Sequence, residues 1–164
     1  MITIKPSEES INEAKKLAKD MGKLNNSITE GQGNVAGFLG EVLVRKLLNA
    51  NQSNTYNYDL ILSDGKTVDV KTKRTGYKPK EYYDCSVAAL NTKQKCDYYA
   101  FVRVMNDYSK AWFIGLIPKE KYFKSSIFMK KGEIDPDNNF TVKSDCYNMS
   151  INNIGIYSEH EEYV

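Results

Sequence analysis

The sequence predicts an α/β domain in which a central mixed β-sheet is flanked by helices. Two amphipathic helical patterns near the N-terminus and a series of strand-like apolar runs after them support this class. The chain of 164 residues, with 41% hydrophobic and 27% charged residues, falls in the range of one ordinary globular domain. No apolar run approaches the ~20 residues that span a bilayer, so we expect no membrane partner and a cytoplasmic protein.

Two helices are expected before the strands. The first should span about residues 8–21, where apolar residues recur at helical spacing, with Ser7 or Ser10 as its cap. The second should span about residues 34–49. Its inward-facing residues should be Val35, Phe38, Leu39, Val42, Leu43 and Leu47.

Gly37 and Gly40 lie within the second helix, where each glycine costs roughly 1 kcal/mol relative to alanine. Close approach of the helix backbone to a neighbouring element is the simplest reason for them. Glu41 lies at the border of the apolar stripe. Burial statistics alone favour a solvated helix carboxylate at this position.

A β-hairpin is predicted over residues 56–73, with its turn at Ser63-Asp64-Gly65. A two-residue turn would divide both apolar rows between the two faces of the hairpin. A three-residue turn with Gly65 in the left-handed conformation keeps them on one face. The expected pairs are then Leu60 with Val68 and Tyr58 with Val70.

The same register places Asp59 directly opposite Asp69, with Lys71 two residues further along on that face. Like charges in this position are destabilising, so a cation should lie between the two carboxylates. Lys71 supplies part of that charge, and a divalent ion with oxygen ligands would supply more. The alternative is a solvated outer face with salt bridges to Lys71 and Lys66.

Further elements follow the hairpin. We expect a strand over about residues 81–90, a short helix or turn over 91–95, and two strong strands over 98–104 and 111–117 that form a second hairpin. Pro118 should end the last of these and open a short helix to about Phe123. Residues 127–154 contain short strand-like segments, and the sequence does not predict where these segments lie in the fold.

The reactive side chains present in the sequence limit the kinds of catalytic site and metal site that we expect. The one histidine, His160, lies near the C-terminus, and the three cysteines, Cys85, Cys96 and Cys146, are widely spaced. Histidine-based hydrolases, zinc sites and a disulfide framework are therefore not expected. Carboxylates, lysines and a hard metal ion remain. Six basic residues against one acid in residues 66–80 favour local phosphate binding.

Three motifs, in the order helix, strand, strand, resemble those of the PD-(D/E)XK nuclease superfamily. They are Gly37-Phe38-Leu39-Gly40-Glu41, Tyr58-Asp59 and Val68-Asp69-Val70-Lys71. The resemblance is closest to small phage and bacterial members, including those related to Holliday junction resolvases. Tyr58 stands where the family more often has proline and Asp69 where glutamate is more frequent, and neither change removes a ligand oxygen.

The resemblance implies a single domain over residues 1–164 with a restriction-endonuclease-like core at about 34–104. An N-terminal helix and a C-terminal β-rich addition would flank this core. It also implies a bacterial or phage-infected host cell. Dimerisation is common among such nucleases, although the sequence shows no interface that would identify a homodimer.

The activity that the resemblance implies is Mg²⁺-dependent hydrolysis of DNA phosphodiester bonds, with endonuclease favoured over exonuclease. Asp59, Asp69 and the carbonyl of Val70 would hold Mg²⁺ or Mn²⁺. Glu41 would complete the shell directly, through water or at a second metal. Lys71 would orient the attacking water and stabilise the developing negative charge.

We expect further residues outside the site to contact the sugar-phosphate backbone of DNA. They are Lys73, Arg74, Lys78, Lys80, Lys93 and Gln94. Interleaved tyrosines at 77, 82 and 83 could stack on bases, although tyrosines in a strand are more often structural. The alternative function is a noncatalytic nucleic-acid-binding or interaction module that keeps this fold.

Overall fold

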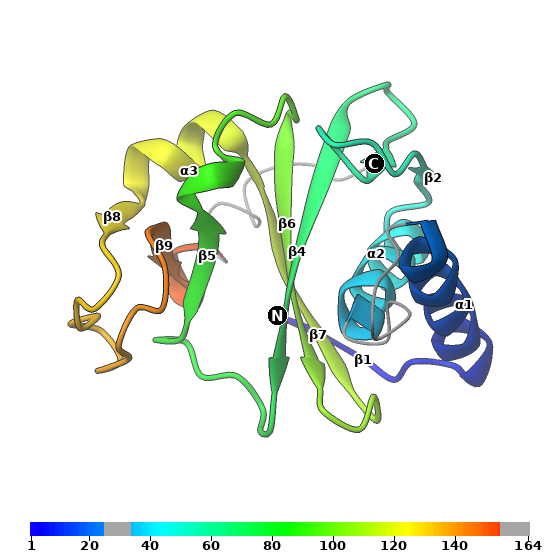
Figure 1. The fold of residues 1–164 in the computed structure, drawn as a ribbon, viewed down its shortest axis with the longest axis horizontal. Coiled ribbons are helices and arrows are strands. Elements are labelled where there is room, and N and C mark those ends of the chain that lie inside the picture. The colour runs from blue at the N-terminus through cyan, green and yellow to red at the C-terminus, as the bar shows by residue number, and fades with distance from the viewer. Residues whose placement is uncertain (25–33, 155–164) are drawn as a thin grey trace.

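The fold has a central β-sheet with helices on one face and a smaller sheet on the other (Figure 1). A computed structural model describes residues 1–24 and 34–154, so His160 lies outside the described part of the chain. The architecture is α/β with a mixed central sheet, which confirms the predicted fold class. None of the helices in the described ranges combines the length and apolarity that crossing a membrane requires.

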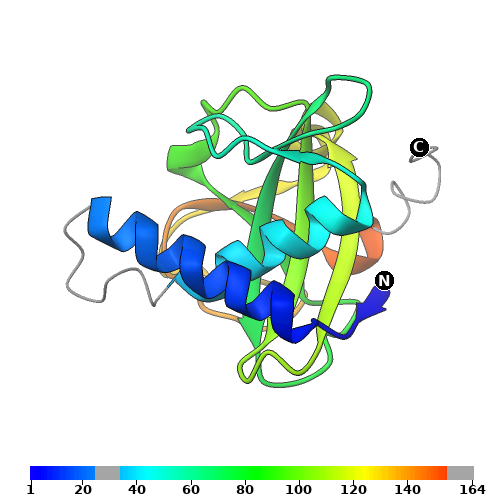
Figure 2. The ribbon, with the colours of Figure 1, turned by 90° about the vertical axis from the view of Figure 1, so that its right-hand side faces the viewer.

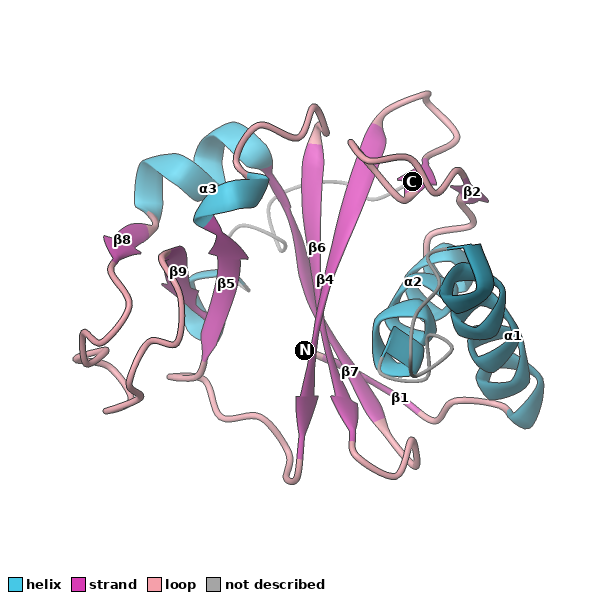
Figure 3. Cartoon of the chain, viewed as in Figure 1, coloured by secondary structure: helices cyan, strands magenta, loops and turns pink. Residues whose placement is uncertain are grey.

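The central sheet has six strands in the order β1-β7-β6-β4-β3-β2 (Figure 3). Strands β4 and β6 run parallel, and the other neighbouring pairs are antiparallel. Strands β6 and β7 are buried over most of their length, as the continuous apolar runs predicted. The bounds are β1 Ile2–Ile4, β2 Asn51–Gln52, β3 Leu60–Ile61, β4 Thr67–Thr75, β6 Tyr98–Met105 and β7 Ala111–Pro118.

Helices α1 (Glu8–Leu24) and α2 (Val35–Leu47) lie side by side across one face of this sheet (Figure 2). Ser7 caps α1, because its hydroxyl accepts a hydrogen bond from the Ser10 backbone N–H at 3.1 Å. The predicted stripe of α2 is buried except for Leu47, which is 40% exposed. The prediction for Leu47 was wrong because the helix ends there and Leu48 packs on the core instead.

The close approach expected from the two glycines of α2 occurs at one of them. A Cβ at Gly40 would lie 1.9 Å from Thr72 Oγ1 in β4, so α2 rests directly on the strand. A Cβ at Gly37 would meet no atom within 4 Å. Packing therefore explains Gly40 and leaves Gly37 unexplained.

A second layer covers the other face of the central sheet. Strands β5 (Asp84–Ala88), β9 (Cys146–Ser150) and β8 (Ile127–Met129) form a three-stranded sheet in that order, next to the short 3-10 helix η2 (Ala89–Asn91). Helix α3 (Lys119–Ser125) begins directly after Pro118, as predicted. The Tyr122 hydroxyl of α3 lies 2.8 Å from the carbonyl oxygens of Cys85 and Tyr147, which links α3 to both β5 and β9.

Asp84 joins this small sheet to the central one. Lys73 Nζ of β4 and Arg103 Nη2 of β6 lie 3.1 Å and 3.2 Å from Asp84 Oδ1. Burial alone would raise the pKa of Asp84, but the charges of Lys73 and Arg103 outweigh it and lower the pKa below its ordinary value. Asp84 is therefore held ionised between two strands of the central sheet.

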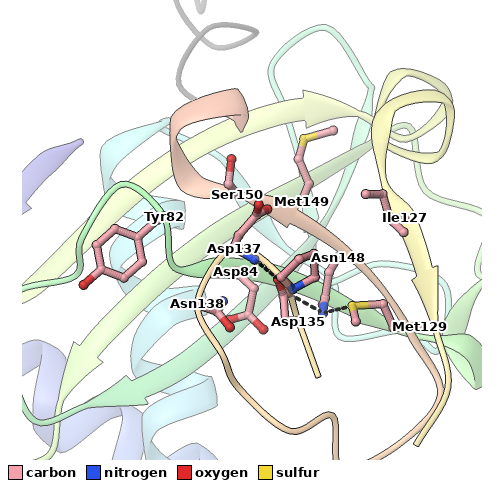
Figure 4. Close-up of a pocket in the computed structure, with 11 residues that line it drawn as sticks. Tyr82, Asp84, Ile127, Met129, Asp135, Asp137, Asn138, Asn148, Met149 and Ser150 are labelled. Atoms are coloured by element: carbon pink, nitrogen blue, oxygen red, sulfur yellow. Dashed lines mark hydrogen bonds between the residues drawn. The ribbon is translucent and has the colours of Figure 1, made fainter. Parts of the chain in front are cut away.

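A hollow of about 50 Å³ lies on the outer side of the small sheet, where three aspartates gather (Figure 4). The carboxylate of Asp135 accepts hydrogen bonds from the Asp137 backbone N–H at 2.9 Å and from Asn148 Nδ2 at 3.4 Å. Both oxygens of Asp135 thus anchor the loop between β8 and β9. We assign this cluster a structural role.

Candidate active site

The predicted hairpin register is confirmed next to the turn. Leu60 pairs with Val68, and Gly65 has φ +86° in the left-handed region. The Leu62 N–H donates to the Lys66 carbonyl at 2.8 Å, which closes a loop of three residues. The regular pairing ends at Leu60, because the Asp59 N–H donates to the Val68 carbonyl at 3.0 Å.

The first strand of the hairpin is shorter than predicted, because β3 contains only Leu60–Ile61. Tyr58 does not pair with Val70. The Val70 N–H instead donates to Asp59 Oδ2 at 2.7 Å, so a side-chain carboxylate takes the place of a backbone acceptor. The Tyr58 carbonyl accepts from the Thr55 N–H at 2.9 Å in a turn of its own.

Strand β3 therefore does not pair with the edge of β4 beyond Val70. On the other side of β4, the carbonyls of Thr67 and Thr75 accept hydrogen bonds from the N–H groups of Asp97 and Asn106. Backbone groups of successive strand residues alternate in direction. The backbone groups that point away from β6 thus belong to Val68, Val70, Thr72 and Arg74. The Val70 carbonyl faces the open edge near Asp59.

Lys71 lies against Asp69 on the face of β4 that carries β5. Its Nζ is 2.6 Å from Asp69 Oδ2, and the Asp69 residue is only 4% exposed. Gln94 Nε2 lies 3.4 Å from Asp69 Oδ1, and Lys71 Nζ donates to Gln94 Oε1 at 3.2 Å. These three side chains form a closed network that holds the Lys71 ammonium in one position.

Glu41 reaches the same place from α2, on the opposite face of β4. Burial raises the pKa of Glu41 to about 8, and the negative charges of Asp59 and Asp69 add to the effect. Gln52 Nε2 donates to Glu41 Oε2 at 3.2 Å and so orients the carboxyl group. The predicted alternative of a solvated helix carboxylate does not describe this residue.

The two aspartates also repel each other. Burial raises the pKa of Asp59 to about 6, the charge of Asp69 contributes, and the Val70 hydrogen bond and Lys71 oppose the shift. Burial likewise raises the pKa of Asp69, against the charge of Lys71. Three carboxyl groups thus share one electrostatic environment that contains one adjacent ammonium, which favours an additional cation.

The oxygen donor atoms of this site are of the chemical type that binds hard cations. Two carboxylates and the Val70 carbonyl are oxygen ligands of the kind that Mg²⁺ and Mn²⁺ take. Asp69 Oδ2 is buried and accepts no well-directed hydrogen bond, and the Lys71 ammonium 2.6 Å away is the main charge that offsets it. Within residues 1–24 and 34–154, no group of three or more His, Cys, Asp or Glu side chains is arranged so that it could hold a metal ion.

The residues expected to contact DNA occupy two different environments. Lys73 Nζ is bound to Asp84 and, at 2.7 Å, to Ser86 Oγ. Gln94 is buried within the site instead of lying on the surface. The remaining cations are exposed, namely Arg74, Lys78, Lys80 and Lys93. Tyr77 is 80% exposed in the loop after β4.

Sequence reasoning missed Gln52 and Lys119 and gave Gln94 a different role, as a contact with DNA. Gln52 orients Glu41 from the two-residue strand β2, which is too short to give a periodic signal. Gln94 also donates to the Tyr56 carbonyl at 2.9 Å, and Lys119 Nζ donates to the Gln94 carbonyl. Gln94 was expected at the DNA interface, whereas the structure buries it among the candidate site residues.

Models of known protein families do not match this sequence, and neither does any curated protein that was compared with it. The chain's own residues and their geometry therefore carry the functional assignment.

Proposed function

We propose that the protein is a Mg²⁺-dependent nuclease that hydrolyses DNA phosphodiester bonds, with endonuclease cleavage favoured. One observation carries the proposal. Asp59, Asp69, Lys71 and Glu41, which come from a loop, a strand and a helix, meet at the open edge of β4. A divalent cation would offset the mutual repulsion of the three carboxylates and the cost of removing their charges from water.

Asp59, Asp69 and the Val70 carbonyl would hold the ion, with Glu41 completing its surroundings. When bound, Mg²⁺ or Mn²⁺ would lower the pKa of a water molecule and neutralise negative charge on the phosphate. The carboxylate of Asp59 is oriented by the Val70 N–H, and that of Asp69 by Gln94. These hydrogen bonds limit how far the ligand oxygens must move.

Lys71 is the candidate for stabilising charge on the reacting phosphate. Its ammonium is held by Asp69 and Gln94 and lies over the ring of Tyr99, with 5.9 Å between Nζ and the ring centroid. A positioned ammonium can orient a water molecule and stabilise negative charge as it develops. The ion pair keeps Lys71 next to the ligand carboxylates rather than in bulk solvent.

Exposed cations would contact the DNA backbone on either side of the site. Arg74, Lys78 and Lys80 follow the open strand, and Lys93 lies in the segment before β6. Such contacts fix the register of the nucleic acid without reading its sequence. Lys73 would contribute less, because Asp84 already balances part of its charge.

The test is incubation of the purified protein with supercoiled, linear and branched DNA in Mg²⁺, Mn²⁺ or EDTA. We expect cleavage in either metal and none in EDTA, with nicking of supercoiled DNA marking an endonuclease. Asp69→Asn and Lys71→Met should abolish cleavage, whereas the matched control Asp20→Asn on the exposed side of α1 should not. DNA binding without cleavage by the wild type would instead support the noncatalytic module.

The same resemblance leads us to place the protein in the cytoplasm of a bacterial or phage-infected cell. A homodimer is the accompanying proposal for its assembly, and light scattering of the purified chain tests it directly.

A further inference from the structure

A cavity of about 300 Å³ opens beside Lys71, where the free edge of β4 meets α2 and β5. This volume is at the lower end of the range for small-molecule sites, about 300–1,000 Å³. It is far too small for a double helix, whose major groove alone is about 12 Å wide. A group of nucleoside size is the largest part of a DNA strand that such a cavity could enclose.

Gly37 forms the α2 side of this cavity. A Cβ there would meet no atom within 4 Å, so the missing side chain leaves open space and not a close packing contact. Glycine in the middle of a helix is unfavourable, and the packing that explains Gly40 does not explain Gly37. A glycine at position 37 keeps the cavity open, and this role accounts for Gly37.

The charged lining of the cavity is predominantly positive. It contains Lys71, Lys73 and Arg103 against the single carboxylate of Asp84, which pairs with both Lys73 and Arg103, while Lys71 pairs with Asp69 beside the cavity. An anionic ligand is therefore favoured over a neutral or cationic one. Other parts of the wall are apolar and aromatic, as from Phe101 and Ile114.

The open edge of β4 adds backbone hydrogen-bonding groups to the charged and apolar side chains that line the cavity. The backbone N–H and C=O of Thr72 point away from β6, on the side of β4 that β3 leaves unpaired. A base edge offers donors and acceptors that such groups can meet. A cationic pocket with an apolar wall and a free peptide edge thus suits a nucleotide, which combines a phosphate with a planar base.

We propose that this cavity receives one unpaired nucleotide of the substrate strand, next to the phosphate at the active site. The preferred DNA would then be single-stranded or locally unpaired. The inference rests on the proposed function for the identity of the strand, because Lys71 belongs to both sites. Exposed Tyr77 and Lys78 lie beyond the cavity along β4 and its following loop, where further unpaired bases could stack.

The experiment measures binding separately from cleavage. Fluorescence anisotropy in EDTA compares a labelled single-stranded oligonucleotide with a blunt duplex of the same sequence. We expect tighter binding of the single strand by the wild type. Gly37→Leu should weaken single-strand binding by roughly tenfold, the equivalent of about 1.4 kcal/mol, and should leave duplex binding unchanged.

Two further variants keep the test decisive. Gly37→Gln fills the same space with a polar side chain and replaces Gly37→Leu if the leucine variant does not fold. Asn12→Leu adds the same apolar bulk on the exposed side of α1 and should leave both affinities at the wild-type level. Melting curves confirm that each variant compared is folded.

The outcomes separate this inference from the nuclease proposal. Equal single-strand affinity of the wild type and the filled-cavity variants, or tighter binding of the duplex, would overturn the cavity proposal even if Mg²⁺-dependent cleavage is observed. Single-strand binding that depends on residue 37, without cleavage in any metal, would support the cavity and reject the nuclease.

Discussion

The Asp59 carboxylate accepts a hydrogen bond from the Val70 backbone N–H at 2.7 Å. This one contact has two consequences. It holds an acidic group close enough to interact with the charge of Asp69, and it takes the place of a backbone pair between β3 and β4, so the edge of β4 beyond Val70 is left open. The candidate metal ligands and the neighbouring cavity both lie along that open edge.

Mn²⁺ should stabilise the wild-type protein and not the Asp59→Asn variant. The asparagine side-chain oxygen can still accept the Val70 N–H, so the fold should persist while an anionic ligand is lost. Binding to the folded state alone adds about 2.7 kcal/mol at a metal concentration of 100 Kd. Melting temperatures with Mn²⁺ and with EDTA provide the measurement. Equal shifts in the two proteins would remove Asp59 from the ligand set.

The metal-free protein should lose stability as the pH rises from about 4.5 to about 8, because the pKa of Glu41 is raised over that interval in the folded state. The folded state keeps a proton that the unfolded chain releases, so the contribution is complete below pH 4.5 and lost above 8. Thermal melting in EDTA should show a smaller decline for Glu41→Gln.

The decline in Glu41→Gln should be reduced but not removed, because the pKa values of Asp59 and Asp69 are also raised. Glu120→Gln, on the exposed surface of α3, is the matched control and should retain the wild-type slope. A wild-type slope in Glu41→Gln would show that Glu41 is solvated after all.

Alanine at the two glycines of α2 should change stability in opposite directions. Gly37→Ala should stabilise by up to about 1 kcal/mol, since the new methyl group meets open space and alanine is the better helix former. Gly40→Ala should destabilise by about 1–3 kcal/mol, because the methyl group would force α2 away from Thr72. Urea unfolding measures both, and a stabilised Gly40→Ala variant would contradict the close approach.

The salt dependence of DNA binding should distinguish free cations from paired ones. Arg74→Ala and Lys78→Ala should each reduce the slope of log K against log salt by about one. Lys73→Ala should reduce it less, because Asp84 already balances its charge. Anisotropy titrations at several salt concentrations provide the slopes. A Lys73 effect larger than the other two would mean that DNA displaces Asp84.

Local sequence patterns were sufficient for several elements. The apolar periodicity of residues 8–21 and 34–49 predicted both helices, because α2 buries one face on the sheet and α1 buries one face against α2. Alternation about Gly65 predicted the pairing of Leu60 with Val68, because any other register would expose half of the apolar side chains. The continuous apolar runs of β6 and β7 reflect burial on both faces.

Contacts between distant segments decided what these patterns could not. β5 was expected as a strand, but its membership of a second sheet depends on partners such as Tyr147, more than 50 residues later. The same applies to Gln94, whose partners Asp69 and Tyr56 are 25 and 38 residues away. No periodicity in a single segment contains this information.

The sequence by itself determined the candidate acidic and basic residues of the site and the register that pairs Leu60 with Val68, because side-chain alternation and turn geometry are local. Only the tertiary structure decided that β3 begins as late as Leu60, that Gln94 turns inward and that a cavity opens at Gly37. Each of these depends on which surfaces meet across the sheet, and that is a property of non-local packing.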